Sequence, residues 1–243
     1  MNKPEFDQFA QDYEAVTGQN TSFFDADAHY FSRYRANLVR KFARTDAGAV
    51  LDFGCGVGLG IGPLREMFPH AKVAGCDPSL ESLALAQARE PDCEFLESNA
   101  IPPGPRFDIV TAVCVFHHIV PAERAGALRY CFERLKPGGK LFIFEHNPFN
   151  PVTQHLVSRC PVDRDAILLT PDETVMRMKQ AGFAVTAREY CLFFPKALAF
   201  LRPLEPYLGW LPLGGQYFVA GTKLQAVAPV SSNLSVEPRG AGP

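Results

Sequence analysis

Two pairs of residues in this 243-residue sequence carry side chains that could move a proton near neutral pH. His117 and His118 follow one apolar run, and Glu145 and His146 follow another. An imidazole changes its charge in this pH range, so it can deprotonate an acceptor or hold it in place. We expect His118 to be the base or substrate-positioning group and His117 to pack or to contact a donor. Glu145 and His146 should face the same cleft. The alternative is a structural role for both residues of the first pair.

Metal chemistry is not expected at these four residues. They include a single carboxylate, whereas Mg²⁺ prefers carboxylates and water. The seven cysteines form no C-x-x-C pair, so neither a zinc site nor a disulfide framework is indicated. Scattered thiols in an odd number fit a reducing cytoplasm, where we expect this protein to reside.

A glycine-rich loop follows the first predicted strand, with the pattern D-x-G-x-G-x-G over residues 52–58. Glycines allow a tight turn and let a ligand approach the main chain closely. A dinucleotide-binding loop would need G-x-G-x-x-G, but the third glycine would fall on Leu59 or Ile61. The G-K-[ST] ending of a phosphate-binding P-loop is absent as well. The loop therefore predicts a nucleotide-like ligand of another kind.

Through this loop the chain resembles the class I (Rossmann-like) S-adenosylmethionine-dependent methyltransferases, over roughly residues 45–190. The resemblance implies S-adenosylmethionine as methyl donor and S-adenosylhomocysteine as product, with the loop along the methionine and ribose portion of the donor. We expect the donor to contact the following residues: Asp52, Gly54, Cys55, Gly56, Gly58, Asp77, Pro78, Asn99, Ala100, Val115 and Tyr13.

Three of these residues have specific expected roles. In the family, a residue like Asp52 helps to hold the loop and the methionine ammonium. Asp77 ends the second predicted strand and is expected to accept both ribose hydroxyls, unless it only caps the helix that begins near Ser79. Asn99 stands where the family often carries an aspartate against the adenine amino group. Its amide can accept from that group and donate to a ring nitrogen; the alternative is an ordinary loop asparagine.

Short apolar runs and helical stretches must position these residues, and their alternation predicts a parallel sheet with helices on both faces. Ligands of such sheets bind at the carboxyl ends of the strands, where the strand order reverses. The resemblance implies an α/β three-layer sandwich with a mostly parallel seven-stranded sheet whose last strand is antiparallel. Strands are predicted at 49–53, 72–76, 93–96, 107–115, 140–145, 183–192 and 215–221, and helices at 4–17, 26–44, 60–67, 79–89, 121–135 and after Thr170 as far as Gly182.

The segments outside the common fold should select the acceptor. Residues 1–44 are expected to be helices that form part of a lid, and 45–224 to be the methyltransferase domain. Its variable segments lie near 147–169 and 192–214, and 225–243 should be a disordered tail. The apolar segment 192–214 predicts either a lid or membrane-surface contact for an amphipathic acceptor, or a packed connection between strands.

Composition narrows the function further. The net charge of -2 and the lack of long basic runs argue against nucleic-acid binding. The basic residues at helical spacing are expected to form a solvated helix face: Arg33, Arg35, Arg40, Lys41 and Arg44. The sequence contains no run of 18 apolar residues, so we expect no membrane-spanning helix. Together with the resemblance, these features lead us to expect methyl transfer to an oxygen or nitrogen of a small molecule, for which an amphipathic or lipid-linked acceptor is one option. The alternative is a non-catalytic relative that acts as a partner or regulatory module; the oligomeric state is left open.

Overall fold

The structure is a computed structural model that describes residues 7, 24, 29–44 and 46–224. The predicted helix over 4–17, apart from Asp7, and the predicted tail over 225–243 lie outside the described residues. Within the described part of the chain, no helix is long and apolar enough to cross a membrane.

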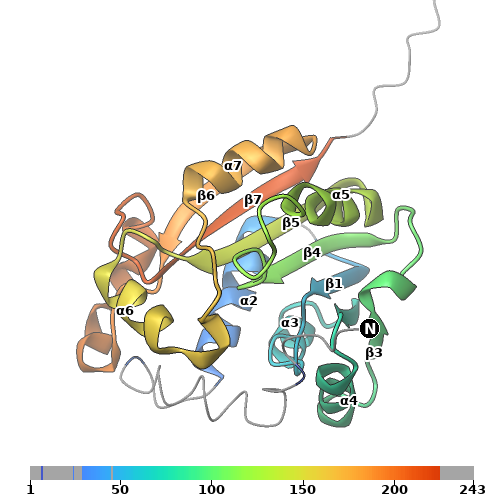
Figure 1. The fold of residues 1–243 in the computed structure, drawn as a ribbon, viewed down its shortest axis with the longest axis horizontal. Helices are drawn as coiled ribbons and strands as arrows, with labels where there is room; N and C mark the ends of the chain where they lie inside the picture. Colours follow the sequence, from blue (N-terminus) through green and yellow to red (C-terminus); the bar gives the residue numbers. More distant parts are fainter. Residues whose placement is uncertain (1–6, 8–23, 25–28, 45, 225–243) are drawn as a thin grey trace, which may run out of the picture.

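A seven-stranded sheet in the order β3-β2-β1-β4-β5-β7-β6 forms the centre of the molecule (Figure 1). Strand β7 runs antiparallel to β5 and β6, whereas the other neighbouring strands pair in parallel. This arrangement confirms the predicted α/β fold with an antiparallel last strand. The strands are β1 Ala49–Phe53, β2 Lys72–Asp77, β3 Glu94–Glu97, β4 Phe107–Val113, β5 Leu135–His146, β6 Phe183–Cys191 and β7 Gln216–Lys223.

Helices cover both faces of this sheet (Figure 1). Two of them, α2 and α3, pack on one face, and α5 and α7 pack on the other, so the fold has three layers. The helices are α2 Tyr30–Ala43, α3 Ile61–Met67, α4 Leu80–Arg89, α5 Arg124–Arg134, α6 Pro151–Arg159 and α7 Pro171–Gln180; the 3-10 turns are η2 Ser98–Ala100, η3 Pro161–Asp163 and η4 Lys196–Tyr207.

The central strands divide their side chains between two cores because successive residues of a strand point to opposite faces. In β5, Leu141 and Ile143 belong to the core beneath α5 and α7, whereas Phe142 and Phe144 belong to the core beneath α2 and α3. All four are buried. The apolar sequence of this strand therefore results from burial on both faces.

The structure corrects two predicted strand boundaries. The strand predicted over 107–115 ends at Val113, because Cys114 has a φ of 56° and turns the chain into a loop that carries the histidine pair. The strand predicted over 140–145 begins earlier, at Leu135, and therefore includes Gly138, which has a φ of 81°, and the point where the pairing with β4 shifts in register.

Helix α6 was missed by the sequence analysis, which treated 147–169 only as a variable segment. Its N-cap residue is Asn150, whose side-chain oxygen accepts hydrogen bonds from the backbone N–H groups of Val152 and Thr153. Pro151 occupies the first helical position, where its missing N–H and fixed φ do no harm. The Asn150 side chain also donates to the carbonyl of Leu213 at 2.7 Å, so one residue starts the helix and ties it to segment 192–214.

Candidate active site

A cavity of about 980 Å³ opens at the carboxyl ends of β1 and β4, where the strand order reverses. Most of the donor and catalytic residues that were predicted from the sequence, and that the structure describes, line this cavity. They are Asp52, Gly54, Cys55, Gly56, Asp77, Pro78, Asn99, Val115, His118 and His146. Gly58, Ala100, His117 and Glu145 lie outside its lining, and Tyr13 lies outside the described residues. The sequence thus located the cleft.

The glycine loop depends on backbone conformations that only glycine adopts readily. Gly54, Gly56 and Gly58 have φ values of 72°, 51° and 81°. A Cβ atom on Gly54 would lie 2.5 Å from a methyl carbon of Val115, and one on Gly58 would lie 3.0 Å from the Cβ of Ala86 in α4. On Gly56 it would meet no heavy atom within 4 Å. Gly54 and Gly58 therefore allow close packing, whereas Gly56 leaves room in the cavity.

Asp77 links the second strand to this loop. Its Oδ2 accepts the backbone N–H of Gly56 and its Oδ1 accepts that of Ser79, both at 2.9 Å. Ser79, not Asp77, is the N-cap of α4, since its hydroxyl accepts from the N–H of Ser82. The alternative in which Asp77 only caps that helix is therefore wrong. Burial raises the pKa of Asp77, while its two N–H donors lower it.

Asp52 lies beneath the loop and is almost fully buried. Its Oδ1 accepts a hydrogen bond from the hydroxyl of Thr111 on β4 at 2.7 Å. Burial raises the pKa of Asp52 to about 6, although Thr111 and the positive charge of Arg35 oppose the shift. A cationic ligand group beside this carboxylate would restore its preference for the ionised form.

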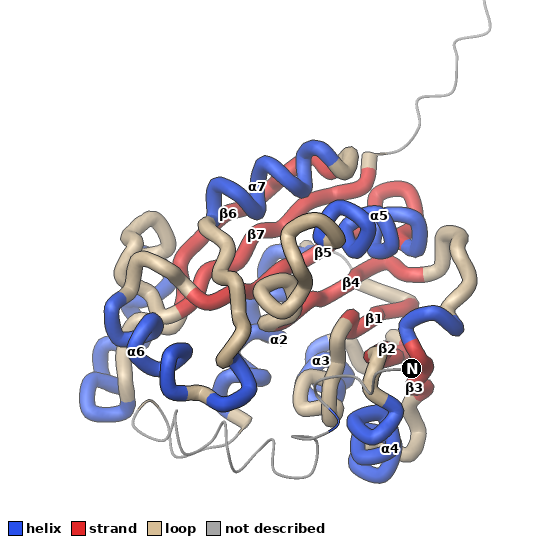
Figure 2. The backbone as a smooth tube through the Cα atoms, viewed as in Figure 1, coloured by secondary structure: helices blue, strands red, loops and turns tan. Residues whose placement is uncertain are grey.

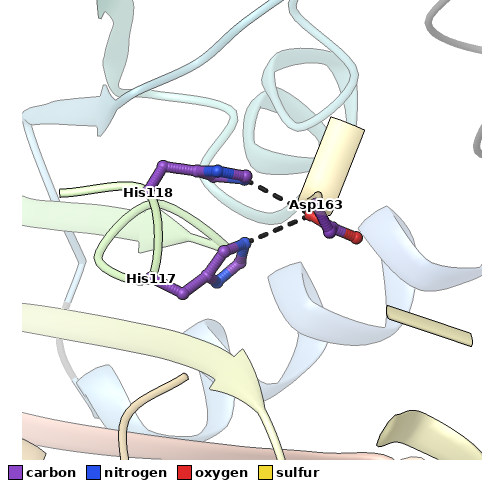
Figure 3. Close-up of side chains that lie close together, drawn as sticks. All are labelled: His117, His118 and Asp163. Carbon is purple, nitrogen blue, oxygen red and sulfur yellow. Dashed lines mark ion pairs between the residues drawn. The ribbon is translucent and has the colours of Figure 1, made fainter. Parts of the chain in front are cut away.

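The histidine pair meets an aspartate that the sequence analysis did not consider. Figure 3 shows the rings of His117 and His118 pointing toward Asp163, the last residue of η3. The Nε2 atoms of both histidines lie 3.4 Å from Asp163 Oδ1, and His146 Nε2 lies 3.9 Å from its Oδ2. Three imidazoles thus surround one carboxylate at the edge of the cavity.

Glu145 fixes the orientation of the His117 ring. Its Oε1 accepts the backbone N–H of Phe116 at 2.8 Å, and its Oε2 lies 2.5 Å from His117 Nδ1. An ionised carboxylate can only accept, so Nδ1 carries a proton and donates it to Glu145. Both side chains are fully buried. Glu145 therefore acts on the site only through His117 and does not reach the cavity itself.

The charges of this cluster are strongly coupled. Burial disfavours a charged His117, but Glu145 and Asp163 outweigh burial and raise the pKa of His117 to about 10. Burial likewise opposes ionisation of Glu145 and Asp163, but the neighbouring histidines hold the pKa of each carboxyl below its usual value. Burial and the charge on His117 lower the pKa of His146 to about 4. The cluster therefore needs positive charge between its two carboxylates, and His146 is neutral at pH 7.

Arg124 fixes the histidine loop against the segment that follows Asp163. Its side chain is buried and donates to the carbonyls of Phe116, Ile119 and Ile167. The N–H of Ile167 in turn donates to the carbonyl of His117 at 2.8 Å. The segment between η3 and α7, which runs as a loop in Figure 2, is thereby held against the residues that carry the imidazoles.

The position of Arg35 corrects the prediction that all five basic residues at helical spacing lie on a solvated helix face. Arg33, Arg40, Lys41 and Arg44 are exposed, as expected for a solvated helix face. Arg35 is half-buried, lines the cavity, and donates from Nε to the side chain of Gln216 at 3.0 Å. Spacing alone did not separate it from its neighbours, because α2 turns only a narrow face toward the sheet.

The cavity wall opposite the glycine loop is largely apolar. Helix α6, the turn η3 and the segment after β6 contribute the following residues: Val152, Leu156, Val157, Val162, Phe193 and Pro195. Beyond the cavity, the residue before the α6 N-cap and segment 192–214 expose Phe149, Phe200, Tyr207 and Trp210, each more than half accessible. Segment 192–214 is nevertheless anchored, since the side chains of Asn147 and Asn150 donate to the carbonyls of Pro212 and Leu213.

Comparison with known proteins identifies the class. Residues 51–141 match a family model described as a methyltransferase domain. An uncharacterized methyltransferase of Staphylococcus carnosus is 28% identical over 142 residues, which cover 58% of this chain and 65% of that protein. A demethylmenaquinone methyltransferase of Thermotoga maritima is 28% identical over 225 residues, which cover 82% of this chain and 94% of that protein.

A solved structure shows the same fold. A methyltransferase of Thermotoga maritima, described as dependent on S-adenosylmethionine and a possible histamine N-methyltransferase, superposes with a TM-score of 0.63 at 20% identity. The match covers 90% of this chain and 98% of that chain. The family model, the curated relatives and the shared fold together support a class I (Rossmann-like) methyltransferase that uses S-adenosylmethionine as cofactor. The predictions of family, fold and cofactor are confirmed.

Proposed function

We propose that this protein transfers the methyl group of S-adenosylmethionine to an oxygen or nitrogen of a small, amphipathic or lipid-linked molecule. The observation that carries the proposal is one cavity with two chemically distinct ends. The glycine loop, Asp52 and Asp77 line one end, and an apolar wall with His118, His146 and Asp163 lines the other.

The donor end accounts for each part of S-adenosylmethionine. Asp52 attracts the methionine ammonium, and Asp77 has lone pairs left for the ribose hydroxyls after its two backbone hydrogen bonds. Asn99 on η2 lies in the cavity lining, and we assign to its amide the contact with the adenine. Gly56 leaves space beside the loop for the ligand.

The N-terminal segment contributes to a lid over the donor. Ser79 lies two residues after Asp77, and its hydroxyl donates to the carboxylate of Asp7 at 2.5 Å. Phe24 and Phe31 line the cavity from the same part of the chain. These contacts so near the ribose-binding residue support a lid role for the part of the segment that carries Asp7 and Phe24, whereas α2 itself packs on the sheet through Val39 and Ala43.

The acceptor end favours a molecule with an apolar body and a polar reacting group. The body would contact the wall formed by α6 and the residues after β6, and the reacting oxygen or nitrogen would lie beside His118. The exposed aromatic residues next to this wall suit a lipid-like tail or a membrane surface. Demethylmenaquinone and histamine, named for two similar proteins, differ so much that they fix no acceptor.

Methyl transfer places the reacting atom in line with the donor's C–S bond, and alignment supplies most of the catalysis. His118 lines the cavity, and we assign to it the removal of the acceptor proton or the positioning of the acceptor. As the C–O or C–N bond forms, the C–S bond breaks and leaves S-adenosylhomocysteine. His118→Ala should leave donor affinity within about twofold and lower turnover of the acceptor by about 10²–10⁴-fold.

The first experiment is calorimetric titration with S-adenosylmethionine and, separately, S-adenosylhomocysteine. Micromolar binding of both supports the donor site and justifies a screen of amphipathic acceptors by methyl transfer. Binding without turnover of any acceptor would favour the second candidate, a non-catalytic relative that acts as a partner. Failure to bind either compound contradicts both candidates.

A further inference from the structure

His117 has a buried nitrogen whose surroundings do not satisfy it. Its Nε2 is inaccessible to solvent and has no hydrogen-bond partner among the described residues. The other ring nitrogen, Nδ1, is hydrogen-bonded to Glu145. Any further ligand of this ring must therefore bind at Nε2, between that atom and Asp163. A lone pair aimed at a carboxylate is repelled, and a cation between the two atoms removes that repulsion.

The spacing around Asp163 fits ligands that share one ion. Asp163 Oδ1 lies 3.4 Å from His117 Nε2 and equally far from His118 Nε2, long for a charge-assisted hydrogen bond. Ligands about 2.0–2.1 Å from a tetrahedral ion lie about 3.3–3.4 Å apart. One donor atom from each of His117, His118 and Asp163 falls within 4.8 Å of the others. Figure 3 shows both imidazole rings turned toward the Asp163 carboxylate.

The surroundings supply what a metal-binding histidine requires. Such a histidine usually donates its second N–H to a carboxylate, which fixes the tautomer and makes the metal-binding nitrogen more basic. Glu145 occupies this position behind His117 and is itself held by the N–H of Phe116. Arg124 and Ile167 hold the histidine loop and the segment after Asp163 together, so the three donors are placed before any ion binds.

We propose that His117, His118 and Asp163 bind one divalent transition-metal ion, of the zinc or cobalt type, at the acceptor end of the cavity. Two imidazoles and one carboxylate suit such ions better than Mg²⁺. The sequence-based argument against magnesium thus still applies, but Asp163 completes a donor set that was not foreseen. His118 and Asp163 line the cavity, so the open fourth position faces the space for the acceptor.

This proposal changes the role of His118 when the ion is present. A ligand to the metal cannot also take a proton, and the ion itself would lower the pKa of an acceptor oxygen, whose proton then leaves to solvent. Without the ion, His117 would carry a second proton between its two carboxylates, and His118 would be the base. In this respect the inference rests on the proposed function, although the binding of the ion does not.

The test is titration of the chelator-treated full-length protein with Co²⁺ alone, followed by its visible absorption, and with Zn²⁺ in competition. We expect one ion per chain and the absorption of a tetrahedral Co²⁺ complex with nitrogen and oxygen ligands. The same protein is titrated with S-adenosylmethionine in the presence of chelator. Donor binding that persists there keeps failure of the metal proposal distinct from failure of the proposed function.

Matched variants locate the ion. His118→Ala and Asp163→Asn should each weaken Co²⁺ binding at least tenfold, and Glu145→Gln should weaken it about 10–100-fold through His117. His155→Ala and Asp165→Asn change exposed residues of the same types and should bind as the original protein does. Thermal unfolding and donor affinity check that each variant is folded. Absence of stoichiometric binding, or binding that His118→Ala and Asp163→Asn leave unchanged, overturns the proposal.

Discussion

Asp77 Oδ2 accepts the backbone N–H of Gly56 at 2.9 Å, so the end of the second strand is hydrogen-bonded to the middle of the glycine loop. The carboxylate shapes the loop and, in the proposed function, also holds the donor's ribose. Hydrogen bonds to a charged acceptor contribute about 1.5–3 kcal/mol each. Both roles therefore depend on one buried side chain.

We expect Asp77→Ala to weaken S-adenosylmethionine binding by at least about tenfold, because the ribose hydroxyls lose a charged acceptor. Calorimetry with S-adenosylmethionine and S-adenosylhomocysteine measures the change. Asp92→Ala, which alters an exposed carboxylate, is the control and should leave affinity unchanged. Equal affinities in the original protein and Asp77→Ala would contradict the ribose assignment.

Gly56 allows a test of the space beside the loop. A Cβ on Gly56 meets no protein atom, so Gly56→Ala should fold with a cost of about 1–2 kcal/mol from its positive φ. The added methyl should nevertheless lower donor affinity at least about tenfold, by occupying the cavity beside the main chain. Gly104→Ala controls for backbone strain, because Gly104 also has a positive φ but does not line the cavity. Unchanged donor affinity in Gly56→Ala would place the donor elsewhere.

The sequence predicted that residues of the glycine loop and of the neighbouring strand lie together at one cavity, because these signals are local. A strand followed at once by D-x-G-x-G-x-G determines where Asp52 and Gly56 lie, and parallel strands bring their carboxyl ends to one edge of the sheet. The same geometry placed His118 and His146 at that edge. These predictions required no knowledge of how distant segments pack.

The rest of the site depends on tertiary packing. Asp163 lies in a 3-10 turn 45 residues after His118, and no motif links the two. Arg33 and Arg35 lie on the same helix, and only the orientation of α2 on the sheet makes one exposed and the other half-buried. Cys114 ends its strand through a left-handed φ that residue type does not favour. Such features follow from the packing of whole segments, so only the structure reveals them.

We expect protonation of Asp52 to change the donor affinity and the free energy of unfolding in opposite directions. The pKa of Asp52 is raised from 3.8 to about 6, so this carboxyl group binds its proton more tightly in the folded state than in the unfolded state. Above pH 6 the buried carboxylate destabilises the fold, by up to about 3 kcal/mol, and this penalty disappears as the pH falls from 6 toward 4. Donor affinity should change the other way, since protonation removes the partner of the methionine ammonium.

Asp52→Asn tests both responses. At pH 8 the variant should unfold at a higher temperature than the original protein, because its amide keeps an acceptor for Thr111 without a buried charge. Its donor affinity should be lower and no longer fall between pH 7 and pH 5. Thermal unfolding and calorimetry at several pH values measure these effects. A variant that is less stable at pH 8 would show that the Asp52 carboxylate is stabilised by its surroundings.

Arg124 should affect the acceptor end without affecting the donor end. Arg124→Met keeps much of the side-chain volume but leaves three carbonyl groups without their donor and Glu173 with one partner fewer. We expect a loss of about 2–4 kcal/mol in the free energy of unfolding, measured by urea denaturation. The histidine loop and Asp163 should then separate, which lowers turnover while donor affinity stays within about twofold. Arg129→Met, on the exposed side of the same helix, should change neither quantity. A variant with normal turnover would mean that the histidine loop and Asp163 are held together without Arg124.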